Sequence, residues 1–130
     1  MSKNNSLSSI YSDKAPAAVG PYSQAIVAGN FIFCSGQIGI DPKTNQLVEG
    51  IENQTHLILS ALKNVLLAAG SDLEHVVKTT IFLKDMKSYV LVNQIYGSVF
   101  ISHKPARATV EVCQLPKDAL IEIELIAIKK

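Results

Sequence analysis

A chain of 130 residues, 48% of them hydrophobic and 18% charged, is long enough to bury the core of one domain and too apolar to be disordered. Its net charge of +1, with the twelve lysines and arginines scattered, excludes the basic surface that a nucleic-acid-binding protein needs. The polar start of the chain is unlike a signal peptide and no apolar run approaches a membrane span, so we expect one cytoplasmic domain over residues 1–130.

The N-terminal quarter predicts a flexible segment followed by a β-hairpin. Residues 1–12 are rich in serine and asparagine, and we expect them to be frayed. Strand-like runs follow at 22–28 and 31–38, and the Gly29-Asn30 pair between them is typical of a hairpin turn.

Two features of this hairpin are candidates for a ligand site. Ser35-Gly36 interrupts an aromatic strand, and a glycine there marks either a simple bulge or the close approach of a ligand to the backbone; the sequence leaves both open. Tyr22 follows the Gly20-Pro21 turn, where its ring either closes over a pocket or, as is commoner, packs on the sheet edge.

The middle of the chain alternates helical and strand-like patterns. Apolar residues recur at helical spacing over 51–69, and Gly70 is placed to end that helix. A β-branched run predicts a strand over 76–83, and a second helix is predicted over 89–100. A further short strand is expected near 47–48.

Two apolar, β-branched runs near the C-terminus, 106–112 and 120–126, predict a pair of strands joined by a turn. Arg107 is therefore expected on a strand beside Glu122 and Glu124, where a guanidinium can bind a substrate carboxylate and a carboxylate can handle a proton. From the residues alone, Arg107 fits a solvated strand face equally well, and both glutamates fit the ordinary alternation of a half-exposed strand better.

The order of elements predicts an α+β fold with two helices on one face of a largely antiparallel or mixed sheet. The runs 31–38 and 120–126 are apolar on both faces, whereas two helices cover only one. We therefore expect the other face to pack against another copy of the chain.

Metal and cofactor sites are not indicated. The three histidines, His56, His75 and His103, have no partner at metal-ligand spacing, and the two cysteines form no CxxC pair. Cys34 and Cys113 both fall in predicted strands and are interpreted as buried or reduced thiols. No phosphate loop, dinucleotide fingerprint or nucleophile elbow occurs.

Eight segments carry a recognisable order and spacing: APAAVGPYSQA at 15–25, SGQI at 35–38, DPKT at 41–44, VKTTIFLKD at 77–85, VN with Tyr96 at 92–96, PARATVEV at 105–112, LPKD at 115–118 and IEIE at 121–124. Together they resemble the YjgF/RidA/UK114 family of small reactive-intermediate deaminases over nearly the whole chain. The resemblance implies a chorismate-mutase-like (ferredoxin-like) fold and a homotrimer with clefts at its subunit interfaces.

The resemblance also implies an activity, which is the cofactor-free hydrolysis of 2-aminoacrylate, 2-iminopropanoate and 2-iminobutanoate to 2-oxo acids and ammonia. By the same resemblance, Arg107 holds the substrate carboxylate and Glu122 activates the attacking water. The cleft would be lined or closed by Tyr22, Ser35, Gly36, Asn93 and the Thr109 segment. Thr109 stands where some members carry a cysteine, so no role of that thiol transfers.

Two other functions stay open beside the deaminase. A non-catalytic trimer that binds 2-oxo acids for regulation, or acts like a chaperone, needs Arg107 but not the Glu122 carboxylate. A nuclease role, which is sometimes attached to the family, is disfavoured by the net charge and by the lack of a basic patch.

Overall fold

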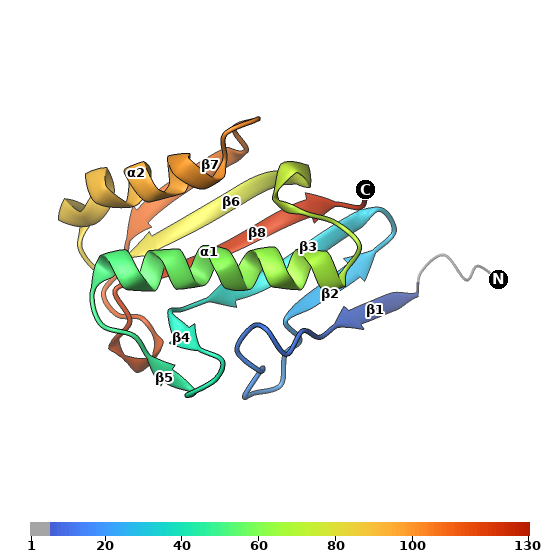
Figure 1. Ribbon diagram of the computed structural model, residues 1–130, viewed down its shortest axis with the longest axis horizontal. Helices are drawn as coiled ribbons and strands as arrows, with labels where there is room; N and C mark the ends of the chain where they lie inside the picture. The colour runs from blue at the N-terminus through green and yellow to red at the C-terminus, as the bar shows by residue number, and fades with distance from the viewer. Residues whose placement is uncertain (1–5) are drawn as a thin grey trace.

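Two helices, α1 (Ile51–Ala68) and α2 (Tyr89–Val99), lie on the same face of a six-stranded sheet in the computed structural model, which describes residues 6–130 (Figure 1). The strand order in the sheet is β1-β2-β3-β8-β6-β7, and β4 and β5 form a separate small ladder. The strands are β1 (Leu7–Ile10), β2 (Ala25–Ala28), β3 (Phe31–Gln37), β4 (Ile40–Asp41), β5 (Gln46–Leu47), β6 (Val76–Leu83), β7 (Ala106–Glu111) and β8 (Ile121–Ile128). The predicted α+β fold is confirmed.

Local signals in the sequence are confirmed at the hairpin and at the first helix. Gly29 has φ 61° at the β2–β3 turn, where Ala28 pairs with Phe31, as expected for a glycine at the first central position of a tight turn. Gly70 has φ 79° and follows the last turn of α1. Its N–H donates to the Leu67 carbonyl while Ser71 N–H donates to Leu66, which is the Schellman arrangement.

The core lies between the helices and the inner face of the sheet. α1 contributes a fully buried stripe, and the central strands β3, β6 and β8 contribute every second residue. The members with no exposed surface include Ile58, Leu62, Val65 and Leu66 of α1 and Ile32, Ile81, Leu83, Ile121 and Ile123 of the sheet.

The predicted pairing of the last two strands is wrong. β7 pairs only with β6, in parallel, whereas β8 lies between β3 and β6 and is antiparallel to both. The reason is the intervening helix: α2 provides the long crossover that a parallel β6–β7 pair requires, which leaves β7 at the edge. β8, apolar along most of its length, takes the central position.

The N-terminal segment is more ordered than its composition suggested. Residues 7–10, expected to be frayed, form β1 and pair antiparallel with β2 from Leu7↔Ala28 to Ile10↔Ala25. The chain beyond β1 is held by the Gln24 amide, which accepts the Ser12 N–H at 2.6 Å and donates to the Ser12 carbonyl at 3.0 Å. Residues 1–5 of the expected flexible segment lie outside the described residues.

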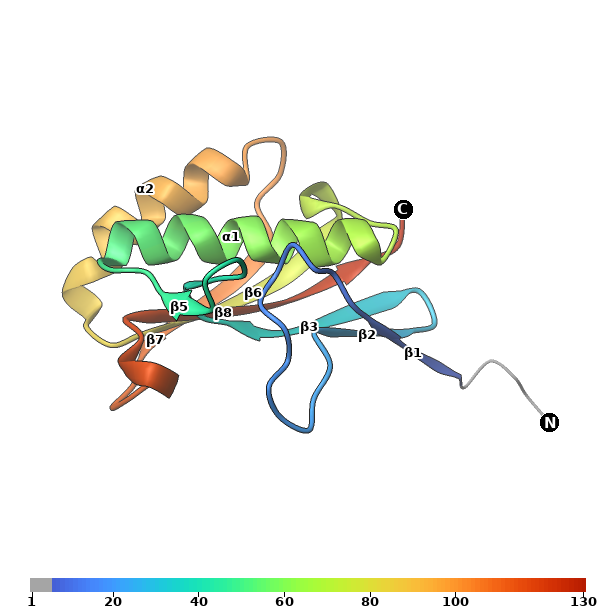
Figure 2. The same ribbon diagram turned by 60° about the horizontal axis from the view of Figure 1, so that its bottom comes forward.

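Neither helix covers the face of the sheet opposite α1 and α2, as Figure 2 shows for the ribbon, and part of this face is apolar. Phe31 and Phe33 are 48% and 45% exposed, with their ring centroids 6.2 Å apart, and Val77 of β6 and Val110 of β7 are exposed as well. A patch of this kind is typical of an interface, and the predicted homotrimer stays a prediction. Within residues 6–130, no helix combines the length and the apolar character needed to cross a membrane.

Candidate functional site

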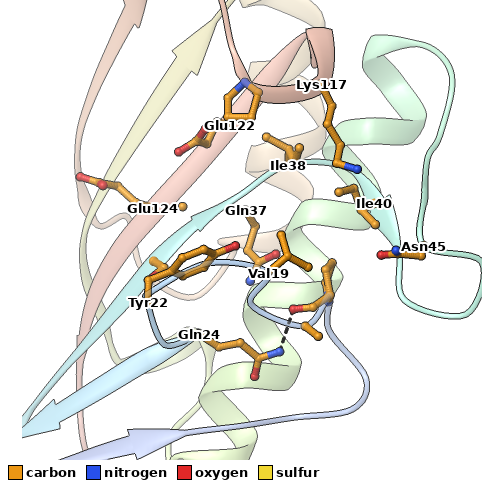
Figure 3. Close-up of a pocket in the computed structure, with 15 residues that line it drawn as sticks. Val19, Tyr22, Gln24, Gln37, Ile38, Ile40, Asn45, Lys117, Glu122 and Glu124 are labelled. Atoms are coloured by element: carbon orange, nitrogen blue, oxygen red, sulfur yellow. Dashed lines mark hydrogen bonds between the residues drawn. The ribbon is translucent and has the colours of Figure 1, made fainter.

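A pocket of about 480 Å³ lies on the uncovered side of the sheet. Two loops that project below the sheet, the one before β2 and the one before β8, border it (Figure 2). Four of the predicted site residues line this pocket, and they come from three separate segments: Tyr22, Ser35, Gly36 and Glu122. Figure 3 labels Tyr22 and Glu122 among them.

Gly36 lies directly against the Glu122 carboxylate. The β3–β8 register shifts between Cys34 and Gln37, so Gly36 occupies a bulge. A Cβ added at Gly36 would lie 2.1 Å from Glu122 Oε2 and 2.9 Å from its Cδ. The interpretation of this glycine as a bulge is therefore confirmed, whereas the close approach of a ligand stays a prediction, because the group next to the Gly36 backbone is a side chain of the protein itself.

The Glu122 carboxyl is electrostatically perturbed. It is half-buried on the outer face of β8, and this burial raises its pKa above the ordinary value of 4.5. The negative charge of Glu124, two residues along the same face, raises it further. A carboxyl in this state holds a proton more readily than a solvated one does, which suits proton transfer to and from a bound molecule.

Ser35 and Tyr22 shape the pocket in different ways. The Ser35 hydroxyl donates to the Ser23 carbonyl at 2.6 Å, and its N–H donates to Gln24 O at 2.9 Å, so Ser35 fastens the loop to β3. Tyr22 packs its ring against Gly20 and is 53% exposed at the wall of the pocket (Figure 3). Tyr22 thus lines the pocket, and its closure over a bound molecule stays a prediction.

The other three predicted residues, Asn93, Arg107 and Thr109, lie elsewhere, between α2 and β7. The Arg107 guanidinium donates to the Tyr89 hydroxyl at 3.1 Å and lies 4.9 Å from the centre of the Tyr96 ring. Asn93 Oδ1 and Thr109 Oγ1 are buried and have no hydrogen-bond partner within the part of the chain that the structure describes. Unpaired buried polar atoms of this kind are rare in proteins and mark this second cluster as unusual.

One chain does not bring Arg107 and Glu122 together. The expected neighbouring strands are separated by β6, and the two side chains leave the sheet on opposite faces. Arg107 pairs with Thr79, whose hydroxyl bonds the Tyr96 hydroxyl on the helix side, whereas Glu122 faces the open side. The seven predicted residues thus form a carboxylate pocket and a separate arginine cluster.

Sequence reasoning missed two residues that shape the pocket. Gln24 is buried and donates to the Pro16 carbonyl at 2.8 Å, which holds the loop wall in place; the signal was a polar residue within an apolar run. Lys117 also lines the pocket, and its backbone is left-handed, with φ 56°. No feature of the sequence predicted its place in the pocket. Cys113, predicted in a strand, is exposed in the loop after β7, whereas Cys34 is buried in β3.

No group of three or more His, Cys, Asp or Glu side chains in residues 6–130 is arranged to hold a metal ion. The pocket offers carboxylates, amides, apolar groups and the Lys117 ammonium, and the second cluster offers a guanidinium. These groups can bind a small anion and exchange a proton with it.

Several known proteins are similar to this chain over nearly its whole length. A family model described as Endoribonuclease L-PSP matches residues 12–129. A RutC family protein of Pyrococcus horikoshii is 52% identical over 93% of this chain and 97% of its own. Reactive Intermediate Deaminase A, chloroplastic, of Arabidopsis thaliana is 48% identical over 91% of this chain and 64% of its own.

Among solved structures, E. coli TdcF with bound serine superimposes with a TM-score of 0.91 at 35% identity, over 95% of this chain and 99% of its own. The match of sequence motifs, of the family model and of the fold all agree. The chain therefore belongs to the Endoribonuclease L-PSP family, which is the YjgF/RidA family that its motifs predicted.

Proposed function

We propose that the protein hydrolyses reactive 2-imino acids and their enamine tautomers, such as 2-aminoacrylate, 2-iminopropanoate and 2-iminobutanoate, to 2-oxo acids and ammonia. The observation that carries this proposal is the Glu122 carboxyl, held in a pocket against the Gly36 backbone with its pKa raised. A relative named as a reactive intermediate deaminase and a structural neighbour that binds serine support the substrate class.

The chemistry follows from the residue types. The substrate is a small planar carboxylate, which suits the two-pronged donor face of Arg107. Protonation of the imine nitrogen makes the adjacent carbon electrophilic. Ionised Glu122 then takes a proton from water as the oxygen adds to that carbon, and it returns the proton to the nitrogen as the C–N bond breaks. As the carbonyl forms, the proton of the added hydroxyl is released to solvent, which balances the proton taken up by the imine nitrogen. One water is consumed, and the products are the 2-oxo acid and ammonia.

The site is completed between two copies of the chain. Within one copy, Arg107 lies on the helix side at the edge of the sheet and Glu122 on the open side, so one substrate cannot reach both. The exposed Phe31 and Phe33 supply an apolar surface for assembly. In a homotrimer with a cleft at each interface, one subunit contributes the pocket of Glu122 and the next contributes the cluster of Arg107.

A coupled assay tests this function. Threonine or serine dehydratase generates the imine, semicarbazide competes for it, and 2-oxo acid formation is followed with wild type, Arg107→Ala and Glu122→Gln. Wild type should accelerate hydrolysis, and neither variant should. If a properly assembled wild type gives no acceleration but still binds 2-oxobutanoate, the deaminase proposal is wrong and the protein is a binder of 2-oxo acids.

Hybrid trimers test the shared site. The two inactive variants are mixed by unfolding and refolding, so that some interfaces combine the intact Glu122 of one subunit with the intact Arg107 of the other. Random assembly makes about a quarter of the interfaces fully intact, so about a quarter of the wild-type activity should return. No recovery in hybrids whose mixing is confirmed by mass would place both residues of a site in one subunit.

A further inference from the structure

We infer that Tyr89 and Tyr96 of α2 are positioning residues that hold the Arg107 guanidinium in the orientation needed to bind a carboxylate. The inference rests on the proposed function, because it assigns Arg107 to the substrate carboxylate. Arg107 Cζ lies 4.9 Å from the centre of the Tyr96 ring and 5.6 Å from that of Tyr89. Both distances are within the range of a cation–π interaction.

Tyr96 is itself fixed to the strand next to the arginine. Tyr96 is 7% exposed, its ring centroid lies 4.6 Å from that of Phe100, and its hydroxyl forms a hydrogen bond with Thr79 Oγ1 at 2.7 Å. Thr79 is the register partner of Arg107 in the β6–β7 pair. The Tyr96 ring under the guanidinium is therefore hydrogen-bonded to the strand residue that lies directly beside Arg107 in the sheet.

Tyr89 restrains the other side. It lies seven residues before Tyr96, which places both rings on one stripe of α2, and its hydroxyl accepts a hydrogen bond from Arg107 Nη2 at 3.1 Å. A guanidinium has two edges from which it can donate two parallel hydrogen bonds, and each Nη2 hydrogen belongs to one of them. Tyr89 therefore occupies one edge and leaves the other for a carboxylate.

The restraint matters because Arg107 stands on an edge strand. An arginine there has several rotatable bonds and, without partners, samples many positions in solvent. Fixing it before the ligand arrives reduces the ordering cost of binding. Because the arginine bond is made equally to substrate and transition state, loss of this restraint should raise KM while kcat changes little.

The test is a double-mutant cycle on binding of 2-oxobutanoate, which needs no turnover. Tyr89→Phe retains the ring and loses the hydrogen bond, and it should weaken binding and raise KM by about tenfold or more, as for one hydrogen bond to a charged group. Tyr89→Leu should weaken binding further. In an Arg107→Ala background, Tyr89→Phe should have no effect, because the tyrosine acts only through the arginine.

The matched control is Tyr11→Phe, a second exposed tyrosine that lies in the segment after β1, away from α2 and β7. It should leave binding unchanged. Tyr96→Phe retains the ring and should retain most of the affinity, although loss of the Thr79 hydrogen bond should lower its Tm. If Tyr89→Phe changes the affinity equally with and without Arg107, or not at all, the inference is wrong.

The outcomes separate the two proposals. Coupling between Tyr89 and Arg107 in 2-oxobutanoate binding, without imine turnover by wild type, supports the positioning role and overturns the deaminase. Imine turnover by wild type without that coupling supports the deaminase and overturns the positioning role. A wild type that neither turns over the imine nor binds 2-oxobutanoate overturns both.

Discussion

Replacing Gly36 with alanine perturbs the proposed catalytic carboxylate and little else. Its backbone φ lies outside the left-handed region that disfavours side chains, so alanine fits the local conformation. The new Cβ would lie 2.1 Å from Glu122 Oε2, whereas ordinary contact begins at 3.4 Å, so the oxygen has to retreat by at least about 1.3 Å. Because it is the end of a flexible side chain, the stability cost should stay near 1 kcal/mol.

The catalytic cost of that displacement should be far larger. A reacting group misplaced by about 1 Å loses on the order of 10²-fold in rate, so Gly36→Ala should lower kcat about 100-fold in the coupled imine assay. KM should change less, because the arginine cluster is untouched. The control is Gly97→Ala in α2, where the added Cβ meets nothing within 4 Å and the fold should be slightly stabilised. Gly36→Ala with wild-type kcat would refute the role given to Glu122.

Three further predictions concern single residues. Glu122→Gln should abolish turnover yet raise the Tm at neutral pH. Because the pKa of the Glu122 carboxyl is raised above 4.5 in the folded protein, the folded protein loses stability as the pH rises from 4.5 to that folded pKa. Glutamine does not ionise, so the variant does not lose this stability. Thermal melts at pH 4 should show a smaller gain, and an equal gain at both pH values would contradict the burial argument. Arg107→Lys keeps the charge but loses the two-pronged donor, so kcat/KM should fall about 100-fold; near-full turnover would exclude the proposed carboxylate contact. Burial raises the pKa of Cys34 to about 12, so a thiol reagent should modify Cys34 only after unfolding, and its rapid labelling in the native protein would show that β3 opens.

The elements that could be predicted from sequence are those whose signals are local. An apolar stripe and Gly70 predict helix α1, and Gly29-Asn30 predicts the hairpin. Each of these signals depends only on residues that are close in sequence. The α+β class followed from the order of such elements. Strand β1 escaped prediction because its residues are exposed on both faces, so its order depends on pairing with β2 rather than on its own pattern.

Strand order could not be predicted from adjacency in the chain. The β7–β8 connection resembles a hairpin in sequence, but the parallel β6–β7 pair and the central position of β8 are decided by where α2 and the apolar surfaces pack. For the same reason the site was predicted as one constellation. The alternation of side chains along each strand predicts that Arg107 and Thr109 share a face and that Glu122 points away from the core. Only the complete sheet shows that Arg107 and Glu122 project from opposite faces.

This separation links activity to assembly. If the substrate carboxylate is held by one copy and the attacking water by the next, an isolated chain retains both half-sites and catalyses nothing. The exposed apolar residues of the open face, Phe31 and Phe33 foremost, then affect catalysis through assembly, without contacting the substrate. Their partners on β8 are Ile128 and Ile126, which lie on the same strand as Glu122, and the bulge at Gly36 separates these pairs from the carboxylate. A change that loosens that surface should therefore lower activity and trimer content together, whereas a change at Gly36 should lower activity alone.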